Sequence, residues 1–146
     1  FGIAVGNSGT VLRTTNAGGV WSIQPTPTQL RLNSVYMVSS SVGFSAGYTG
    51  TILRTTDGGL SWQQISTGTA ADLWDIHFAN PNLGIAVGGT YSSPYQIVLR
   101  TTNAGTTWSA PYFVTASRCT LKTVFLVSSL EIRLKSEFVF GARAFV

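Results

Sequence analysis

Three arginines occupy the same position in a segment that recurs along this 146-residue chain. Arg13, Arg54 and Arg100 each stand directly before a Thr-Thr pair. Because a guanidinium group binds a carboxylate through two parallel hydrogen bonds, an exposed row of arginines would recognise an acidic peptide or another carboxylate. An arginine that is present in every copy can instead stabilise the repeated structure. We favour this structural alternative, in which each arginine bonds carbonyls or an acid of the neighbouring sheet.

Three tyrosines could add a contact surface. Tyr48, Tyr91 and Tyr95 are predicted to lie in loops between the second and third strands of their segments. Exposed aromatic side chains in loops commonly supply binding contacts. Together with the three arginines they form the predicted set of binding residues, and these loops are the predicted ligand face.

A catalytic pair is a weaker interpretation. His77, the only histidine, lies two residues after Asp75 in an apolar run, and strand alternation places both on one face. A general base held by a carboxylate has this arrangement, but so does an ordinary polar pair at a strand edge. No nucleophile motif accompanies the pair, and the only glutamates, Glu131 and Glu137, lie in the C-terminal segment. We therefore predict no catalytic residues and no enzyme.

An internal repeat carries these residues. Trp21, Trp62 and Trp108 close three copies of one pattern and lie 41 and then 46 residues apart. Each copy has a G-[IF]-[AS]-[AV]-G run followed by a [IV]-L-R-T-T run. The five additional residues of the second interval fall within 90–96, which indicates a loop insertion. Similar apolar runs stand at 32–38, 73–79 and 121–127.

The repeat predicts four short strands per unit, placed in the second unit at 32–38, 43–47, 51–56 and 61–65. Such runs are rich in Val, Ile, Thr and aromatic residues and are punctuated by Gly, Ser and Asn. A period near 41 with four strands is typical of propeller blades. The predicted fold is all-β, with four-stranded antiparallel blades numbering three to three and a half. The expected units are 1–31, 32–72, 73–120 and the start of a fourth at 121–129, followed by a divergent segment, 130–146.

Each unit also contains a Thr-x-Asp/Asn-x-Gly-x-x-Trp pattern, which resembles the Asp box of bacterial neuraminidase repeats. In that family the Asp box forms the peripheral hairpin between the third and fourth strands of a blade. An Asp or Asn oxygen can accept backbone N–H groups two or three residues on, Gly adopts a positive φ, and Trp covers the hairpin. The matching residues are Thr14, Asn16, Gly18 and Trp21; Thr55, Asp57, Gly59 and Trp62; and Thr101, Asn103, Gly105 and Trp108.

Calcium binding is an alternative role for Asp57 and the two equivalent asparagines. Calcium takes roughly 6 to 8 oxygen ligands and usually several carboxylates, whereas each turn supplies one carboxylate or none. We therefore predict structural turns, with no metal and no cofactor. For the tryptophans, packing within the blade is favoured over stacking on a ligand.

The longer string G-x-x-G-x-[IV]-L-R-T-T-[DN]-x-G-x-x-W resembles the repeats of the photosystem II stability/assembly factor family over about residues 1 to 128. The resemblance implies a non-enzymatic propeller. Photosynthetic members are lumenal and chaperone a reaction-centre subunit, whereas many relatives are secreted or surface proteins. Sialidases share the Asp box, but their chemistry needs three arginines from different blades, a tyrosine nucleophile with a glutamate partner, and an acid/base aspartate. Here the arginines repeat one position, and no FRIP-like segment occurs.

The predicted function is therefore a non-catalytic binding module for a protein or peptide in an extracytoplasmic compartment (periplasmic, lumenal or secreted), with an assembly-factor-like role. One alternative is a carbohydrate-binding or sialidase-like propeller. Another is an architectural repeat of a larger secreted or surface protein.

The composition of the chain argues against several kinds of partner and structure. The net charge of +4 is concentrated in the last 29 residues, so no basic stripe with interleaved aromatics predicts a nucleic-acid partner. A single cysteine, Cys119, excludes an intrachain disulfide. No apolar run approaches the roughly 18 residues of a membrane span.

The number of predicted blades affects the expected oligomeric state. The pattern starts inside a repeat, which suggests a fragment or a processed product, and it ends after Ser129. Because propellers close with roughly 4 to 8 blades, we expect a homo-oligomer to complete the ring if the chain is the whole molecule.

Overall fold

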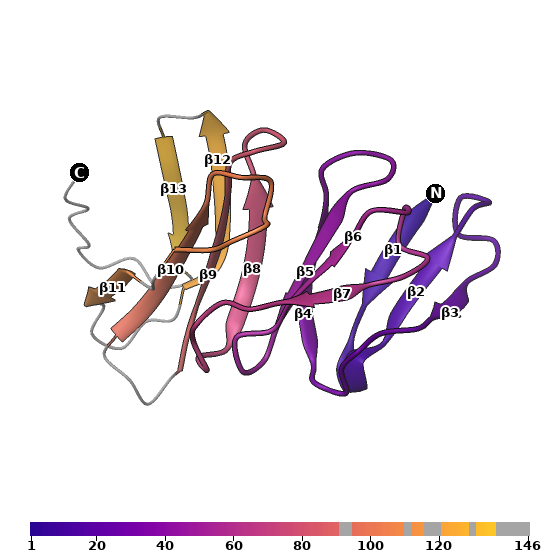
Figure 1. Cartoon of the computed structure of the whole chain (residues 1–146), viewed down its shortest axis with the longest axis horizontal. Coiled ribbons are helices and arrows are strands. Elements are labelled where there is room, and N and C mark those ends of the chain that lie inside the picture. Colours follow the sequence, from indigo (N-terminus) through magenta and orange to yellow (C-terminus); the bar gives the residue numbers. More distant parts are fainter. Residues whose placement is uncertain (91–94, 110–111, 116–120, 129–130, 137–146) are drawn as a thin grey trace.

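The strands of this protein form successive antiparallel sheets. The computed structural model describes residues 1–90, 95–109, 112–115, 121–128 and 131–136. Apart from one 3-10 turn, η1 (Asn7–Gly9), its regular elements are strands, so the predicted all-β class is confirmed. They form sheets of three, four and four strands and a final two-stranded pair. Figure 1 shows these sheets following one another along the long axis.

Within each sheet, strands adjacent in sequence are adjacent in space, which is the meander expected of a blade. The first sheet contains β1 (Gly2–Val5), β2 (Val11–Thr14) and β3 (Ser22–Gln24). The second contains β4 (Leu32–Met37), β5 (Gly43–Gly47), β6 (Ile52–Thr55) and β7 (Gln63–Ile65). The third contains β8 (Leu73–Phe78), β9 (Gly84–Gly89), β10 (Tyr95–Thr101) and β11 (Tyr112–Thr115). The last pair is β12 (Leu121–Ser128) and β13 (Glu131–Ser136).

Strand β13 lies in the segment for which the repeat predicted no element. It pairs antiparallel with β12, for example through Val124 and Leu134. The sequence from Glu131 to Lys135 alternates charged and apolar residues, a pattern typical of a strand. The remainder of the divergent segment, 137–146, and residues 129–130 lie outside the described residues.

Apolar side chains between the sheets form the core. Phe44 of the second sheet stacks on Phe78 of the third, with ring centroids 4.5 Å apart, and both are buried with Leu99. A second cluster between the first and second sheets contains Val11 and Trp62. Since burying one such side chain contributes about 1.5–3 kcal/mol, face-to-face packing of the sheets is the main stabilising contact.

The hairpin between β6 and β7 is closed by side-chain hydrogen bonds. The Thr55 hydroxyl donates to Oδ1 of Asp57 over 2.8 Å and accepts the backbone N–H of Gly59 over 2.9 Å. Oδ1 of Asp57 also accepts the backbone N–H groups of Leu60 and Ser61, each over 3.0 Å. These N–H groups point into the hairpin, where no strand partner is available to accept them, so the side chains determine the shape of the turn.

The same network recurs in the other two units. Thr14 accepts the N–H of Gly18 over 3.1 Å, and Thr101 accepts that of Gly105 over 3.0 Å. Asn16 and Asn103 accept backbone N–H groups four residues on, over 2.9 and 3.0 Å. The acceptor therefore reaches three or four residues ahead, one further than expected. We call the segments 14–21, 55–62 and 101–108 the Thr-Asx turns.

Each Thr-Asx turn has two successive residues with positive φ, and the first of them is not always glycine. Ala104 has φ 56°, whereas Gly58, in the equivalent place, has φ 72°. An L-residue other than glycine is strained there by about 1–2 kcal/mol, so Ala104→Gly should raise the free energy of unfolding by about 0.5–1 kcal/mol. The control Ala86→Gly, in a buried strand, should lower it by about 1 kcal/mol. Urea denaturation measures both changes. A lower free energy of unfolding for Ala104→Gly as well as for Ala86→Gly would contradict the conclusion that Ala104 is strained.

Asp57 should give the fold an acid-sensitive turn. The side-chain and backbone hydrogen bonds from Ser61, followed by that from the Thr55 hydroxyl, lower its pKa from 3.8 to about 2. A carboxylate with a depressed pKa stabilises the folded state above its unfolded pKa, and this stabilisation is lost as the pH falls from about 4 to about 2.

The Asp57→Asn variant should therefore unfold with a weaker pH dependence in that range. Asn103 shows that an amide fits the turn, because its Nδ2 donates to the hydroxyl of Thr107 over 2.8 Å. Urea midpoints for both proteins across the acid range measure the difference. Parallel pH profiles would show that the charge of Asp57 has no such role.

Candidate functional surface

The two ends of the blades carry different structures. Gly43 at the start of β5 pairs with Thr55 at the end of β6, so the Thr-Asx turn lies at this end of the sheet. Gly47 at the end of β5 pairs with Leu32 at the start of β4, and the β5–β6 loop lies at the opposite end. We call these the turn end and the loop end.

The three predicted arginines lie toward the turn end, one in each sheet. The Nε of Arg13 donates to the carbonyl of Gly58, in the Thr-Asx turn of the next sheet, over 2.8 Å. Arg54 is half-buried, and no acceptor for its Nε is found among the described residues. Arg100 is exposed. The contact made by Arg13 is the inter-sheet carbonyl bond of the structural alternative.

Tyr48 and Tyr95 lie toward the loop end. Tyr48 follows β5 and is half-buried. Tyr95 is 50% exposed and is the first residue of β10, paired with Thr115, so its assignment to a loop was wrong. The strand starts earlier than expected because β11 extends the pairing. Tyr91 lies outside the described residues. The predicted binding residues that the structure describes are therefore divided between the turn end and the loop end of the blades.

An aromatic and cationic cluster forms around Tyr48. The guanidinium carbon of Arg31 lies 5.7 Å from the centroid of the Tyr48 ring. Trp74, in β8 of the next sheet, meets the same ring edge-on at 5.7 Å between centroids. Arg31 is exposed, whereas Tyr48 and Trp74 are half-buried. We call these three residues the loop-end cluster.

Hydrogen bonds fix the backbone and the indole of this cluster. The N–H of Tyr48 donates to the carbonyl of Arg31 over 2.9 Å, and the indole N–H of Trp74 donates to the carbonyl of Gly89 over 2.9 Å. The N–H of Thr49 donates to Oδ1 of Asp72 over 3.0 Å. Since each aromatic residue is held in place before any ligand arrives, binding would require little additional ordering.

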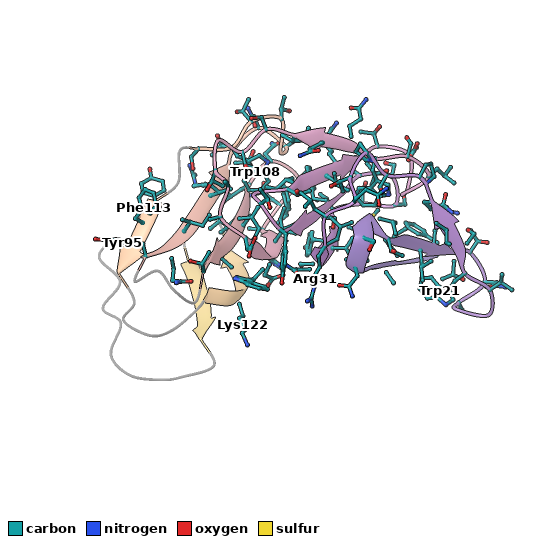
Figure 2. All side chains as sticks on the ribbon, turned by 90° about the horizontal axis from the view of Figure 1, so that it is seen from below. Trp21, Arg31, Tyr95, Trp108, Phe113 and Lys122 are labelled. Carbon is teal, nitrogen blue, oxygen red and sulfur yellow. The ribbon has the colours of Figure 1, made fainter. Side chains whose placement is uncertain are left out.

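A second cation lies at the loop end. Lys122 is exposed near the start of β12, which occupies the position of β4 and β8 in their sheets. In Figure 2 the side chains of Arg31 and Lys122 project from the same side of the molecule. A guanidinium group beside two aromatic rings, with a second cation on the same side of the molecule, is suited to an extended peptide that carries a carboxylate and apolar side chains.

Asp75 and His77 lie between the second and third sheets. Oδ1 of Asp75 accepts the hydroxyl of Ser34 over 2.6 Å, and the His77 ring lies 4.5 Å from that of Tyr36. Both contacts join β8 to β4, which supports a packing role for the pair. Among the residues that the structure describes, no three His, Cys, Asp or Glu side chains are grouped to hold a metal ion.

Arg31 and Trp74 were not among the residues predicted from the sequence. Each flanks the leucine that begins the first strand of a four-stranded sheet, Leu32 or Leu73. Both flanking positions fall at the loop end because β4 and β8 start there. An Arg or Trp directly beside the leucine that starts such a strand is therefore a sequence signal that could have located the cluster.

Comparison with known proteins identifies a related fold. The chain is similar to a solved structure described as YCF48 bound to D1 peptide, with 25% identity and a TM-score of 0.61. The similarity covers 74% of this chain and 34% of that one, so this chain spans about a third of that structure. No family model matches the sequence, and no curated protein matches it. The fold is thus that of a YCF48-like β-propeller. Within the described part of the chain, no helix is long and apolar enough to cross a membrane.

Proposed function

We propose that this protein is a non-catalytic β-propeller module that binds an extended peptide segment at the loop end of its blades. The observation that carries the proposal is the loop-end cluster, in which Arg31, Tyr48 and Trp74 converge from two adjacent sheets. The structural neighbour, which was solved with a peptide bound, supports the same type of ligand.

The chemistry of the cluster suggests how a peptide would be held. The exposed guanidinium of Arg31 is placed over the Tyr48 ring and keeps its hydrogen-bond donors available for a carboxylate. The rings of Tyr48 and Trp74 offer apolar surface to the neighbouring side chains of the ligand. Lys122 adds positive charge on the same side of the molecule. The preferred ligand is therefore a peptide with an acidic side chain, or a terminal carboxylate, next to apolar residues.

The remaining predicted residues take two roles in this proposal. Tyr95 extends the contact surface at the loop end, and Tyr91, which lies outside the described residues, stays a predicted contact. Arg13, Arg54 and Arg100 act between sheets at the turn end. We also propose an assembly-factor-like role in an extracytoplasmic compartment, with each of the units 1–31, 32–72 and 73–120 contributing one blade's strands. A carbohydrate-binding or sialidase-like propeller and an architectural repeat remain the rival functions.

A titration with a labelled D1 peptide tests the proposal. We expect saturable binding, and either Arg31→Gln or Tyr48→Leu should raise the Kd about tenfold, which corresponds to about 1.4 kcal/mol. The matched control Arg100→Gln removes the same charge at the turn end and should leave the Kd within about twofold. Absence of binding, or an equal loss in the control, would contradict the proposal. Hydrolysis of a fluorogenic sialoside would instead favour the sialidase-like rival.

A further inference from the structure

A hollow of about 290 Å³ lies at the loop end of the second sheet, beside the loop-end cluster. It opens between the β5–β6 loop and the segment 66–72 that connects β7 to β8, and it is lined by Thr49, Gly50 and residues 64–69. Thr49 directly follows Tyr48, so the hollow and the cluster share one loop. The second sheet packs against both the first and the third sheet, so the hollow belongs to an internal unit of the array.

Hydrogen bonds within the chain fix the two segments that form the hollow. The hydroxyl of Thr67, a buried residue, donates to the carbonyl of Gly50 over 2.8 Å. The N–H of Gly50 donates to the carbonyl of Ala71 over 2.8 Å. A Cβ added to Gly50 would overlap the carbonyl oxygen of Thr69, so the loop and the connecting segment are in direct contact. The hollow therefore has its shape before a ligand arrives, and binding would require little ordering of the backbone.

Uncharged polar side chains line this hollow. The hydroxyls of Thr49 and Ser66 and the amide of Gln64 are exposed and make no hydrogen bond within the described part of the chain. A Cβ added to Gly68 would meet no atom within 4 Å, so the space beside this glycine is open. The lining contains no Asp, Glu, Lys or Arg, so a charged group of a ligand would find no counter-ion in it.

The first sheet has the same loop contact with a different lining. The hydroxyl of Thr26 donates to the carbonyl of Gly9 over 2.8 Å, which is the bond between a threonine and a glycine that also fixes the second sheet. Ile23 and Pro25, however, stand at the positions of the glutamine and the serine of the hollow. The loop contact thus needs the glycine and the threonine but not the polar lining, which is available for a ligand.

We propose that the hollow binds an uncharged polar side chain (Asn, Gln, Ser or Thr) of the same extended peptide that the loop-end cluster holds, an inference that rests on the proposed function. Hydroxyl and carboxamide groups both donate and accept hydrogen bonds, so they match the amide and hydroxyls of such a side chain. The volume lies just below the roughly 300 Å³ at which small-molecule sites begin, which suits one side chain of a larger ligand. No aromatic ring lines the hollow for stacking on a sugar, so a peptide is favoured over a saccharide.

Paired labelled peptides test this specificity. Both members of a pair carry a glutamate and an apolar residue, and about two to four residues away one member has glutamine where the other has leucine. At the best spacing, fluorescence anisotropy should give a Kd about fivefold lower for the glutamine member, as expected of hydrogen bonds between uncharged groups. Gln64→Ile, which introduces the residue type of the first unit, should abolish this preference. The matched control Gln63→Ile changes an exposed glutamine of the same strand that does not line the hollow, and it should retain the preference. Circular dichroism verifies that both variants fold.

The remaining outcomes separate this proposal from the proposed function. Equal Kd values within every pair, with Arg31→Gln weakening both members, would overturn the polar subsite and leave peptide binding intact. A preference for glutamine that survives Gln64→Ile would show that the side chain is recognised elsewhere. If none of these peptides binds but the labelled D1 peptide does, the ligand class assigned here is wrong, and if neither binds, both proposals fail. NMR shifts of the amides of residues 66–69 on addition of galactose, but not of peptide, would show that the hollow takes a saccharide instead.

Discussion

Replacing Gly105 by alanine should destabilise the protein by about 3 kcal/mol, because two costs add at this position. Gly105 has φ 69°, where an L-residue with a Cβ is strained. The added Cβ would also overlap the ring of Phe44, which is fully buried in the core between the second and third sheets. Both the backbone and the packed ring would have to move. Urea denaturation monitored by tryptophan fluorescence measures the loss.

Gly18 provides the matched control for this substitution. It occupies the same place in the first Thr-Asx turn and has φ 92°, but no side chain of another sheet lies near it among the described residues. Gly18→Ala should therefore cost only the backbone strain, about 1 kcal/mol. Equal losses at Gly105 and Gly18 would contradict the conclusion that the ring of Phe44 packs directly against Gly105.

Trp62→Ala should destabilise the protein by about 3–4 kcal/mol, within the range measured for buried aromatic residues. The indole is 5% exposed and packs with Val11, Leu32 and Leu53, so its loss would leave a cavity between the first and second sheets. Its N–H also donates to the carbonyl of Gly59 over 3.3 Å. Thermal denaturation should show a large decrease in Tm.

Trp21 is the control for Trp62, since it ends the equivalent turn but is 42% exposed. In the monomer, Trp21→Ala should cost less than about 1 kcal/mol, as expected of a surface substitution. The measurement is made at low protein concentration so that association does not contribute. If Trp21→Ala were as damaging as Trp62→Ala, the first sheet could not be the exposed end of the array.

The blades could be predicted because their determinants are local. The Thr-Asx turn depends on a hydroxyl, an Asx oxygen and a glycine within five residues, so three copies of the pattern identified three hairpins. Strand positions in the second unit were predicted to within about two residues for the same reason, since alternation and turn residues act over short distances. The strand β13 was missed because it departs from the repeat and is recognised only by its own alternation.

The proposed binding surface was only partly predictable because it depends on how neighbouring sheets are placed. Tyr48 was identified from its loop, but Arg31 and Trp74 contact it from another loop and from the next sheet. The repeated arginines were predicted to bind a ligand because a guanidinium group can bind a carboxylate. The structure shows that Arg13 instead donates to a carbonyl of the turn in the next sheet. Sequence spacing showed that these positions repeat, and the pairing of the strands then showed at which end of the blades each one lies.

These contacts suggest different roles for the two ends of the blades. The Thr-Asx turns use their polar groups within the hairpins and their glycines against the neighbouring sheet, so the turn end serves the fold. At the loop end, Arg31 and Lys122 are exposed on the same side of the molecule. A ligand that needs cationic and aromatic groups would therefore meet them at the loop end.

Hydrogen–deuterium exchange with and without saturating D1 peptide tests the location of the binding surface most directly. The account predicts that the peptide slows exchange of the backbone amides around 47–50 and 72–74, at the loop end, and leaves those of the Thr-Asx turns 55–62 and 101–108 unchanged. Slower exchange confined to the Thr-Asx turns would contradict the account and would place the ligand at the arginine row.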